Sequence, residues 1–460
     1  MTSRTATRRD FMRRACAALG AAAGAQALHS LHAVAAHAQS ALDRRGAATV
    51  DEYRALVCVF LGGGNDSWNT IVDLDDYASY AATRGSLALP QASLVPIQTL
   101  TGSRHFGLHP SLAELQPLWQ SRQLALLCNV GTLVRPITRA EYLAHPELRP
   151  INLFSHSDQV YQWHSGSSNP PLPTGWGGRL GDRTAGLNAG SSFPLMASIA
   201  GVPLFGTGET TRPLELTTQG SLALSGFSGS ATSQVRWEGL LRAQQVDRSH
   251  AFVRAGGDTL LRSIGANQVL SAALASAPPL NTAFPATSLG DQLKMVARTI
   301  SVRAALGVRR QVFFCSLGGF DTHSNQLATQ AALLTQVGQA LAAFHAATVE
   351  LQVADGVTAF THSDFSRTYK FNGGGTDHAW GSCQLVLGGA VRGGDAYGQW
   401  PTLALGGPDD SGSSGRFIPT TAVDQYTSTL ALWFGLPAAE VPLVFPNIGR
   451  FGSADLGFMA

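Results

Sequence analysis

The sequence predicts an α/β fold in which helices cover both faces of a mostly parallel β-sheet. Short apolar runs, each followed by Gly or polar residues, are typical of buried parallel strands and span residues 55–61, 124–130, 311–317 and 357–361. Stretches with helical spacing of apolar residues lie between these runs and span residues 110–120, 288–305 and 326–351. Strands that alternate with helices along the chain indicate a parallel sheet between two helical layers.

Residues 39–460 are expected to form a single domain of this class, with one departure. Residues 193–205 and the Gly/Ser/Thr-rich stretch that follows predict short antiparallel strands, so residues 192–235 are interpreted as a small β-rich insertion, either a cap or a sheet edge. Residues 424–434 have the spacing of a short amphipathic helix near the C-terminus.

The composition of the 460-residue chain excludes several classes of protein. Only 13% of the residues are charged and 50 are glycine, which argues against a disordered polymer and against a coiled coil. The formal net charge of +2, without a basic stripe, provides no surface for nucleic acid. No CxxC spacing occurs, so we expect buried free thiols at Cys58, Cys128, Cys315 and Cys383.

Residues 1–38 have the features of a twin-arginine signal peptide. The segment from Thr7 to Arg13 contains paired arginines, an Ala-rich apolar run follows, and Ala36-His37-Ala38 resembles a cleavage site. The apolar run is too weakly hydrophobic for a stable membrane span. We therefore expect transport by the twin-arginine export machinery and a periplasmic or otherwise exported protein; a cytosolic basic tail is the alternative.

Acidic and imidazole side chains follow the ends of predicted strands, where parallel α/β sheets place their ligand sites. The first strand leads through three glycines to Asp66, a candidate metal carboxylate whose alternative role is to cap the next helix. The 311–317 strand leads to Asp321 and His323, whose spacing of two lets both face one cation.

Further candidates follow the 357–361 strand. Asp364 could be another metal carboxylate, and Arg367 could hold an anionic substrate oxygen or form a structural Asp–Arg pair. Asp377 and His378 come after a glycine-rich loop and offer one more acid and imidazole. No HExxH, GxSxG or Walker A motif occurs, which argues against a zincin, an α/β-hydrolase and a P-loop nucleotide site. The remaining candidates are the Asp and His residues at the strand ends, which suit a hard or borderline divalent cation.

Ser155 has two interpretations. Together with Asp158 it matches the capping-box pattern Ser-x-x-Asp, and capping alone is the simpler role. A serine at a helix N-terminus is also well placed as a nucleophile, because the positive end of the helix and a nearby cation would favour its alkoxide.

Taken together, these segments resemble a family catalogued as a domain of unknown function, DUF1501, whose members are typically exported bacterial proteins placed in the alkaline phosphatase and sulfatase superfamily. The resemblance covers nearly the whole mature chain. It is carried by residues 60–66, 106–110, 155–156, 175–180, 318–323, 363–368, 377–378, 393–401 and 446–447.

The resemblance implies an alkaline-phosphatase-like fold and a metal-dependent hydrolase of phosphate or sulfate esters. It assigns Ser155 as the nucleophile, and we also expect His156 and Arg367 in the catalytic set. It implies one or two divalent ions (Zn, Mn, Mg or Ca) on Asp66, Asp321, His323, Asp364, Asp377 and His378. The substrate would be a small-molecule or glycan ester, with a co-encoded exported protein as a potential partner. The alternative is a non-catalytic exported binding protein that keeps the fold.

Overall fold

The structure, a computed structural model, describes residues 53–170, 172–220, 230–246 and 248–460. The predicted signal peptide, residues 1–38, lies outside the described residues. Every residue described belongs to one compact unit, Val50–Ala460. Among the described helices, none combines the length and the apolar character needed to cross a bilayer.

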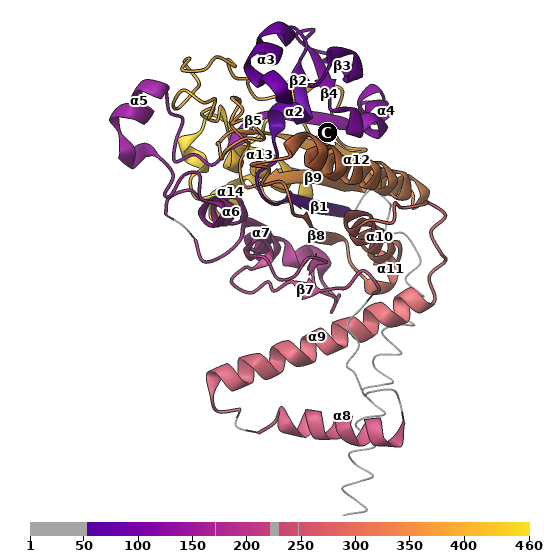
Figure 1. Ribbon diagram of the computed structural model, residues 1–460. Coiled ribbons are helices and arrows are strands. Elements are labelled where there is room, and N and C mark those ends of the chain that lie inside the picture. Colours follow the sequence, from indigo (N-terminus) through magenta and orange to yellow (C-terminus); the bar gives the residue numbers. More distant parts are fainter. Residues whose placement is uncertain (1–52, 171, 221–229, 247) are drawn as a thin grey trace, which may run out of the picture. The chain divides into compact units, whose positions relative to one another are not determined.

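The described residues form a nine-stranded central sheet with strand order β11-β5-β10-β9-β1-β8-β6-β7, and β12 pairs with β5 (Figure 1). Its three middle strands are β1 (Arg54–Leu61), β8 (Arg310–Leu317) and β9 (Val357–Ser363), and both β8 and β9 pair in parallel with β1. Nearly all of their side chains are buried, as expected for strands covered on both faces. The α/β class and the mostly parallel sheet are therefore confirmed.

Two parts of the sheet differ from the sequence expectation. β10 (Ser382–Gly388) runs antiparallel between β9 and β5 (Leu124–Gly131), and sequence analysis predicted no strand there. At the other edge, β6 (Met196–Ser198) and β7 (Leu214–Glu215) pair in parallel rather than antiparallel. The chain between β6 and β7 is too long for a hairpin turn and crosses over instead, which is what parallel pairing requires.

The remaining strands and helices surround these elements. β11 (Ala396–Tyr397) and β12 (Thr421–Ala422) extend the main sheet beside β5, whereas β2 (Ile71–Asp73), β4 (His105–Leu108) and β3 (Val95–Gln98) form a separate antiparallel sheet. The helices are α2 (Ser67–Thr70), α3 (Tyr77–Arg84), α4 (Gln116–Gln120), α5 (Arg139–Ala144), α6 (His156–Ser165), α7 (Trp176–Thr184), α8 (Ala231–Ala243), α9 (Ala251–Ala275), α10 (Ser288–Ser301), α11 (Arg303–Leu306), α12 (Gln326–Glu350), α13 (Val423–Phe434) and α14 (Val441–Val444).

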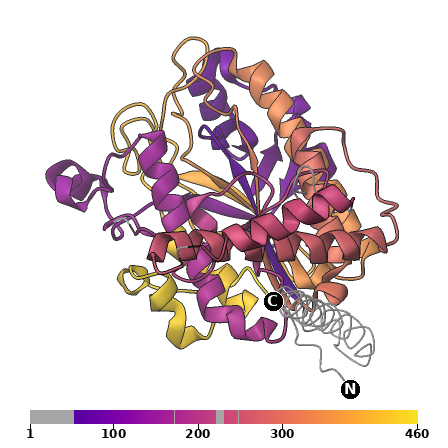
Figure 2. The same ribbon diagram turned by 90° about the horizontal axis from the view of Figure 1, so that it is seen from below.

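The core lies on both faces of the sheet because alternate side chains of β1 point in opposite directions. The odd-numbered residues of β1 belong to a hydrophobic cluster that includes α10 and α12, and the even-numbered residues belong to one that includes α6, α7 and α13. Figure 2 shows these two groups of helices on opposite sides of the sheet. The four cysteines of the described chain are buried and free, as expected.

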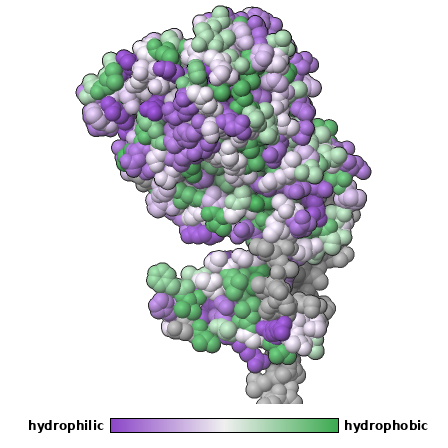
Figure 3. Space-filling view, in the orientation of Figure 1, coloured by the Kyte–Doolittle hydropathy of each residue, from purple (hydrophilic) through white to green (hydrophobic). Residues whose placement is uncertain are grey.

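Helices α8 and α9 carry an exposed apolar surface. Val235 and Val246 are largely exposed and Phe252 is 84% exposed, and Figure 3 shows hydrophobic residues gathered over these two helices. The C-terminal half of α9 belongs to the core instead, through Ala266 and Leu270.

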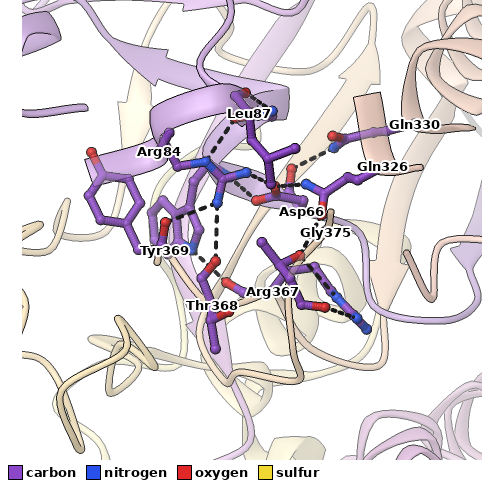
Figure 4. Close-up of polar contacts among 12 residues, drawn as sticks. Asp66, Arg84, Leu87, Gln326, Gln330, Arg367, Thr368, Tyr369 and Gly375 are labelled. Carbon is purple, nitrogen blue, oxygen red and sulfur yellow. Dashed lines mark hydrogen bonds and ion pairs between the residues drawn. The ribbon is translucent and has the colours of Figure 1, made fainter. Parts of the chain in front are cut away.

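A buried ion pair anchors the turn that follows β1 (Figure 4). Asp66 caps α2 by accepting from the Trp68 backbone N–H at 3.1 Å, and its other oxygen pairs with Arg84; both side chains are 0% exposed. Arg84 also donates to the backbone carbonyls of Thr368 and Tyr369, each at 3.1 Å. The pair therefore joins the turn after β1 to the loop after β9.

Two histidines, His164 of α6 and His362 of β9, are buried in the apolar core on the side of the sheet that α6 covers. His362 of β9 packs among aromatic rings, with the Trp163 ring centroid at 4.9 Å, and within the described chain neither of its ring nitrogens has a hydrogen-bond partner. Burial, and secondly the proximity of His164, lowers the pKa of His362 well below its usual range. Burial lowers the pKa of His164 to about 4. Both imidazoles are thus neutral in the folded protein at neutral pH.

Replacing Arg84 should destabilise the protein strongly. Arg84→Met leaves the Asp66 carboxylate buried without its cation, and we expect the free energy of unfolding in urea to fall by about 3–5 kcal/mol. The control is Arg242→Met, which removes an exposed pair with Glu238 and should cost under about 1 kcal/mol. The double variant Asp66→Asn/Arg84→Met should recover part of the loss. A single-variant loss as small as that of the control would contradict the role of the pair.

Acid should destabilise the protein through His362 and His164. The unfolded chain binds protons on these imidazoles below about pH 6.5, whereas the folded chain does not. Stability is therefore full above about pH 6.5 and falls as the pH drops toward 4. His362→Phe should flatten this fall in Tm, measured by thermal denaturation, while His250→Gln on the surface should leave it unchanged. An unaltered Tm profile in His362→Phe would refute the assignment.

Candidate metal centre

The loops that follow β1, β8 and β9 meet at one end of the sheet. The three strands end side by side, because Leu61 pairs in register with both Leu317 and Ser363. Gly63 lies at the point of closest approach: its φ is +112°, and a Cβ there would lie 2.4 Å from the Asp321 backbone nitrogen. Only glycine fits there, so the glycine run after β1 lets this loop pack directly on the loop after β8.

Three imidazoles converge on one carboxylate oxygen in this region. The Oδ1 atom of Asp321 lies 3.0 Å from His323 Nε2, 3.3 Å from His378 Nε2 and 3.5 Å from His156 Nε2. The ligand atoms of His156, Asp321 and His378 all lie within 4.8 Å of one another. Residues from α6 and from the loops after β8 and β9 thus form one cluster, which we call the His/Asp cluster.

Each imidazole is held at its other nitrogen by a separate acceptor. His156 Nδ1 donates to Asp364 Oδ2 at 2.7 Å, and His378 Nδ1 donates to the Phe154 carbonyl at 2.8 Å. His323 Nδ1 lies 3.3 Å from Asp377 Oδ1. These contacts fix the orientation of the rings, so the Nε2 atoms of all three rings face Asp321. Protein metal sites commonly orient their histidine ligands in this way.

The His/Asp cluster fits a divalent cation. His156 Nε2 is buried without a hydrogen-bond partner among the described residues, and its ring belongs with Asp321 and His378 to a set whose ligand atoms all lie within 4.8 Å of one another. His323 Nε2 lies beside this set, 3.1 Å from His378 Nε2. A cation held by His156, Asp321 and His378 would give His156 Nε2 a partner. Imidazole and carboxylate are ligands that zinc and other borderline divalent ions accept.

The electrostatics of the His/Asp cluster keep its carboxylate ionised. Although partial burial works in the opposite direction, the hydrogen bond and charge of Arg367 hold the pKa of Asp321 below its usual value. Burial lowers the pKa of His378, which keeps that ring neutral and able to bind a cation. The hydrogen bond to Asp364 raises the pKa of His156, so a cation competes with a proton at this ring.

Three acids predicted as metal ligands have other contacts here. Both oxygens of Asp364 are engaged, by the Gly63 backbone N–H at 2.9 Å and by His156, so Asp364 orients a ligand instead of being one. Asp377 holds His323 in the same way, and it also accepts from Asn372 at 3.0 Å. Asp66 lies outside the His/Asp cluster, because its oxygens are occupied by Arg84, Gln326 and the helix it caps.

Arg367 is also structural in this geometry. Its side chain is fully buried and donates from Nη1 to Asp321 at 2.7 Å, while its other donors contact Thr376 and the Gly63 carbonyl. The alternative of an Asp–Arg pair therefore describes Arg367, with Asp321 as the partner.

Ser155 occupies the N-cap position of α6, as predicted, but its hydroxyl does not cap the helix backbone. Its Oγ donates to Asp158 Oδ2 at 2.6 Å. The residues on either side belong to the centre: Phe154 accepts from His378, and His156 is part of the His/Asp cluster. Sequence analysis did not predict the role of the Phe154 carbonyl, because every residue has such a backbone atom and the sequence does not distinguish this one. The Ser-x-x-Asp pattern, in contrast, did indicate Asp158.

Solved structures that resemble the chain include a sulfatase from Pseudoalteromonas sp., with 10% identity and a TM-score of 0.34 over 88% of this chain and 72% of that one. A phosphonate monoester hydrolase from Silicibacter pomeroyi has 10% identity and a TM-score of 0.35 over 85% and 77% of the two chains. A lipoteichoic acid synthase from Listeria monocytogenes has 8% identity and a TM-score of 0.31 over 78% and 73%.

No curated protein matches the chain. A family model described as a protein of unknown function, DUF1501, matches residues 53–422, which is most of the sequence and includes every residue of the centre. The chain therefore belongs to the DUF1501 family.

Proposed function

We propose that this protein is an exported, metal-dependent hydrolase of phosphate or sulfate esters with Ser155 as its nucleophile. The observation that carries the proposal is the convergence of three imidazoles, each oriented by its own acceptor, on Asp321. Metal sites characteristically hold the ring nitrogen that faces away from the ion in this way, whereas a chance cluster on the surface has no reason to hold every Nδ1.

His156, His378 and Asp321 would hold the divalent ion, with His323 beside them. When bound, the ion supplies positive charge that stabilises developing negative charge on a phosphoryl or sulfuryl oxygen and lowers the pKa of a nearby hydroxyl. Arg367 keeps Asp321 ionised and fixed, and Asp364 and Asp377 keep two of the rings turned toward it. These three residues position the centre and do not contact substrate in this proposal.

Ser155 has a base within reach. The hydrogen bonds from Ser155 and Asn152 lower the pKa of Asp158, so its carboxylate is ionised at neutral pH and can take the hydroxyl proton. The N-terminus of α6 favours the resulting negative charge on Oγ. Oγ then forms a bond to phosphorus or sulfur as the bond to the alcohol breaks, and water later cleaves the serine ester.

Export is part of the proposal and rests on the sequence pattern of residues 1–38. The paired arginines, the apolar run and the small-residue site occur in the order of a twin-arginine signal. A folded protein that carries its ion through this route would reach the periplasm ready to act.

The His/Asp cluster should bind a divalent ion in solution. We expect the purified protein to bind Zn²⁺ in competition with a chromophoric chelator, and His378→Ala to lose most of this affinity because a ligand is gone. Asp364→Asn should weaken binding about 10- to 100-fold, because it removes only an orienting contact. His105→Ala, outside the cluster, serves as the control. If His378→Ala bound Zn²⁺ as tightly as the wild type, the centre would be assigned wrongly.

Ser155→Ala separates a hydrolase from a binding protein. Hydrolysis of 4-nitrophenyl phosphate or sulfate should fall at least about 10³-fold, because the attacking oxygen is removed. Zinc affinity should not change, since Ser155 is not a ligand. Ser121→Ala, whose exposed hydroxyl contacts Leu118 and Gln123 and no residue of the centre, is the control and should keep most of the activity. Wild-type turnover in Ser155→Ala would exclude the nucleophile, and a wild type inactive on both esters would favour the binding protein.

A further inference from the structure

A pocket opens beside the proposed nucleophile. It has a volume of about 520 Å³, and most of its lining comes from the loop that joins α5 to α6. Figure 1 shows the course of this loop between the two helices. Its lining includes Tyr142, Arg149, Ile151, Asn152, Phe154 and Asn169. The volume falls within the usual range for small-molecule sites. The pocket ends at the residue that precedes Ser155 in the chain.

Two residues of the pocket wall also hold the catalytic groups. Asn152 donates to Asp158 Oδ1 at 2.9 Å, and Asp158 in turn accepts from Ser155. Phe154 accepts from His378 through its carbonyl at 2.8 Å. Phe154 has a φ of +75° and Asn152 a φ of +50°, so the chain bends sharply twice in this wall. The pocket wall is thus connected to the proposed active site through direct hydrogen bonds.

The wall combines flat apolar surfaces with one guanidinium group. The Cζ atom of Arg149 lies 4.3 Å from the Tyr142 ring centroid. The Phe154 ring is contacted from outside the lining by Arg416, whose Cζ lies 4.6 Å from the ring centroid. Ile151 adds an aliphatic surface that is 43% exposed. The Arg149 guanidinium covers one face of the Tyr142 ring and brings hydrogen-bond donors to the pocket wall.

Several polar groups of the pocket have no partner in the described part of the chain. These are the Tyr142 hydroxyl, the side-chain amide of Asn169 and the Arg149 Nη1 atom; Arg149 otherwise donates to the Tyr142 and Leu143 carbonyls. Glu147, the acid in this lining, contacts His145 at 3.0 Å. The pocket therefore offers unpaired donors and acceptors around an aromatic surface.

We infer that this pocket is the leaving-group subsite and binds a sugar ring, so that the substrate is a phosphate or sulfate ester of a sugar. The inference rests on the proposed function. A sugar ring has apolar C–H faces and a rim of hydroxyls, which match the aromatic surfaces and the unpaired polar groups together. A purely apolar alcohol would leave Arg149 and Asn169 without partners.

Ser155, Asp158 and solvent account for every bond and proton that changes in the reaction. Ser155 Oγ forms its bond to phosphorus or sulfur while the bond to the sugar oxygen breaks. The sugar oxygen leaves into the pocket and takes a proton from solvent, and the free sugar diffuses out. The Ser155 proton goes to Asp158.

The kinetic test compares large and small alcohol groups. In Arg149→Met, which keeps the aliphatic contact with Tyr142 but removes the donors, KM for glucose 6-phosphate or glucose 6-sulfate should rise about tenfold. Methyl phosphate and methyl sulfate do not reach the pocket, so their kcat/KM should stay within about twofold. Arg149→Lys should rescue part of the loss, and Asn169→Ala should act in the same direction as Arg149→Met.

A binding test examines the sugar subsite independently of ester hydrolysis. Glucose should bind the wild-type protein in an NMR titration, and Arg149→Met should weaken that binding. Sugar binding without hydrolysis of any ester would refute the proposed function and leave the subsite supported. Equal effects of Arg149→Met on methyl and sugar esters, or no effect on either, would overturn the subsite. Phenyl phosphate affected as strongly as the sugar ester, with no glucose binding, would identify an aromatic-alcohol pocket and also overturn it.

Discussion

The buried ion pair between Asp66 and Arg84 is the constraint on which the site depends. It is 0% exposed on both sides and links the turn after β1 with the end of α3 and the loop after β9. Gln326 at the start of α12 bonds Asp66 and also accepts from Thr376, beside the cluster residues Asp377 and His378. A charge pair in an apolar interior tolerates little displacement, because an unpaired charge there is costly. The ion pair therefore fixes the loops that contain the residues of the metal centre.

The metal centre contains candidate ligands and separate groups that orient them. Asp321 and the Nε2 atoms of three histidines face one another, while Asp364, Asp377 and the Phe154 carbonyl each hold an Nδ1 atom. Arg367 balances the charge of Asp321 from the buried side. This arrangement suits a site that must present fixed donor atoms at a half-exposed surface, where water would otherwise let the side chains rotate.

The proposed reaction groups form a continuous row. The pocket wall at Asn152 contacts Asp158, Asp158 contacts Ser155, and the next residue along the chain, His156, belongs to the His/Asp cluster. One short segment at the start of α6 thus connects a leaving-group subsite, a nucleophile with its base, and a cation site. A change in the backbone bend at Phe154 would displace all three together.

The α/β class, the four apolar strands, the buried thiols and the segments that contain the site could be predicted from the sequence, because they follow from local hydrophobic patterns and strand ends. The sequence also indicated Asp321, His323 and His378 as close neighbours. It did not identify β10 or the parallel pairing of β6 and β7, since strand partners lie far apart in the chain. Nor did it separate ligands from orienting residues. Whether Asp364 or Asp66 faces a cation depends on which hydrogen-bond donors the fold brings to its oxygens, and those donors, Gly63, His156, Arg84 and Gln326, come from distant segments that only the tertiary structure places in contact.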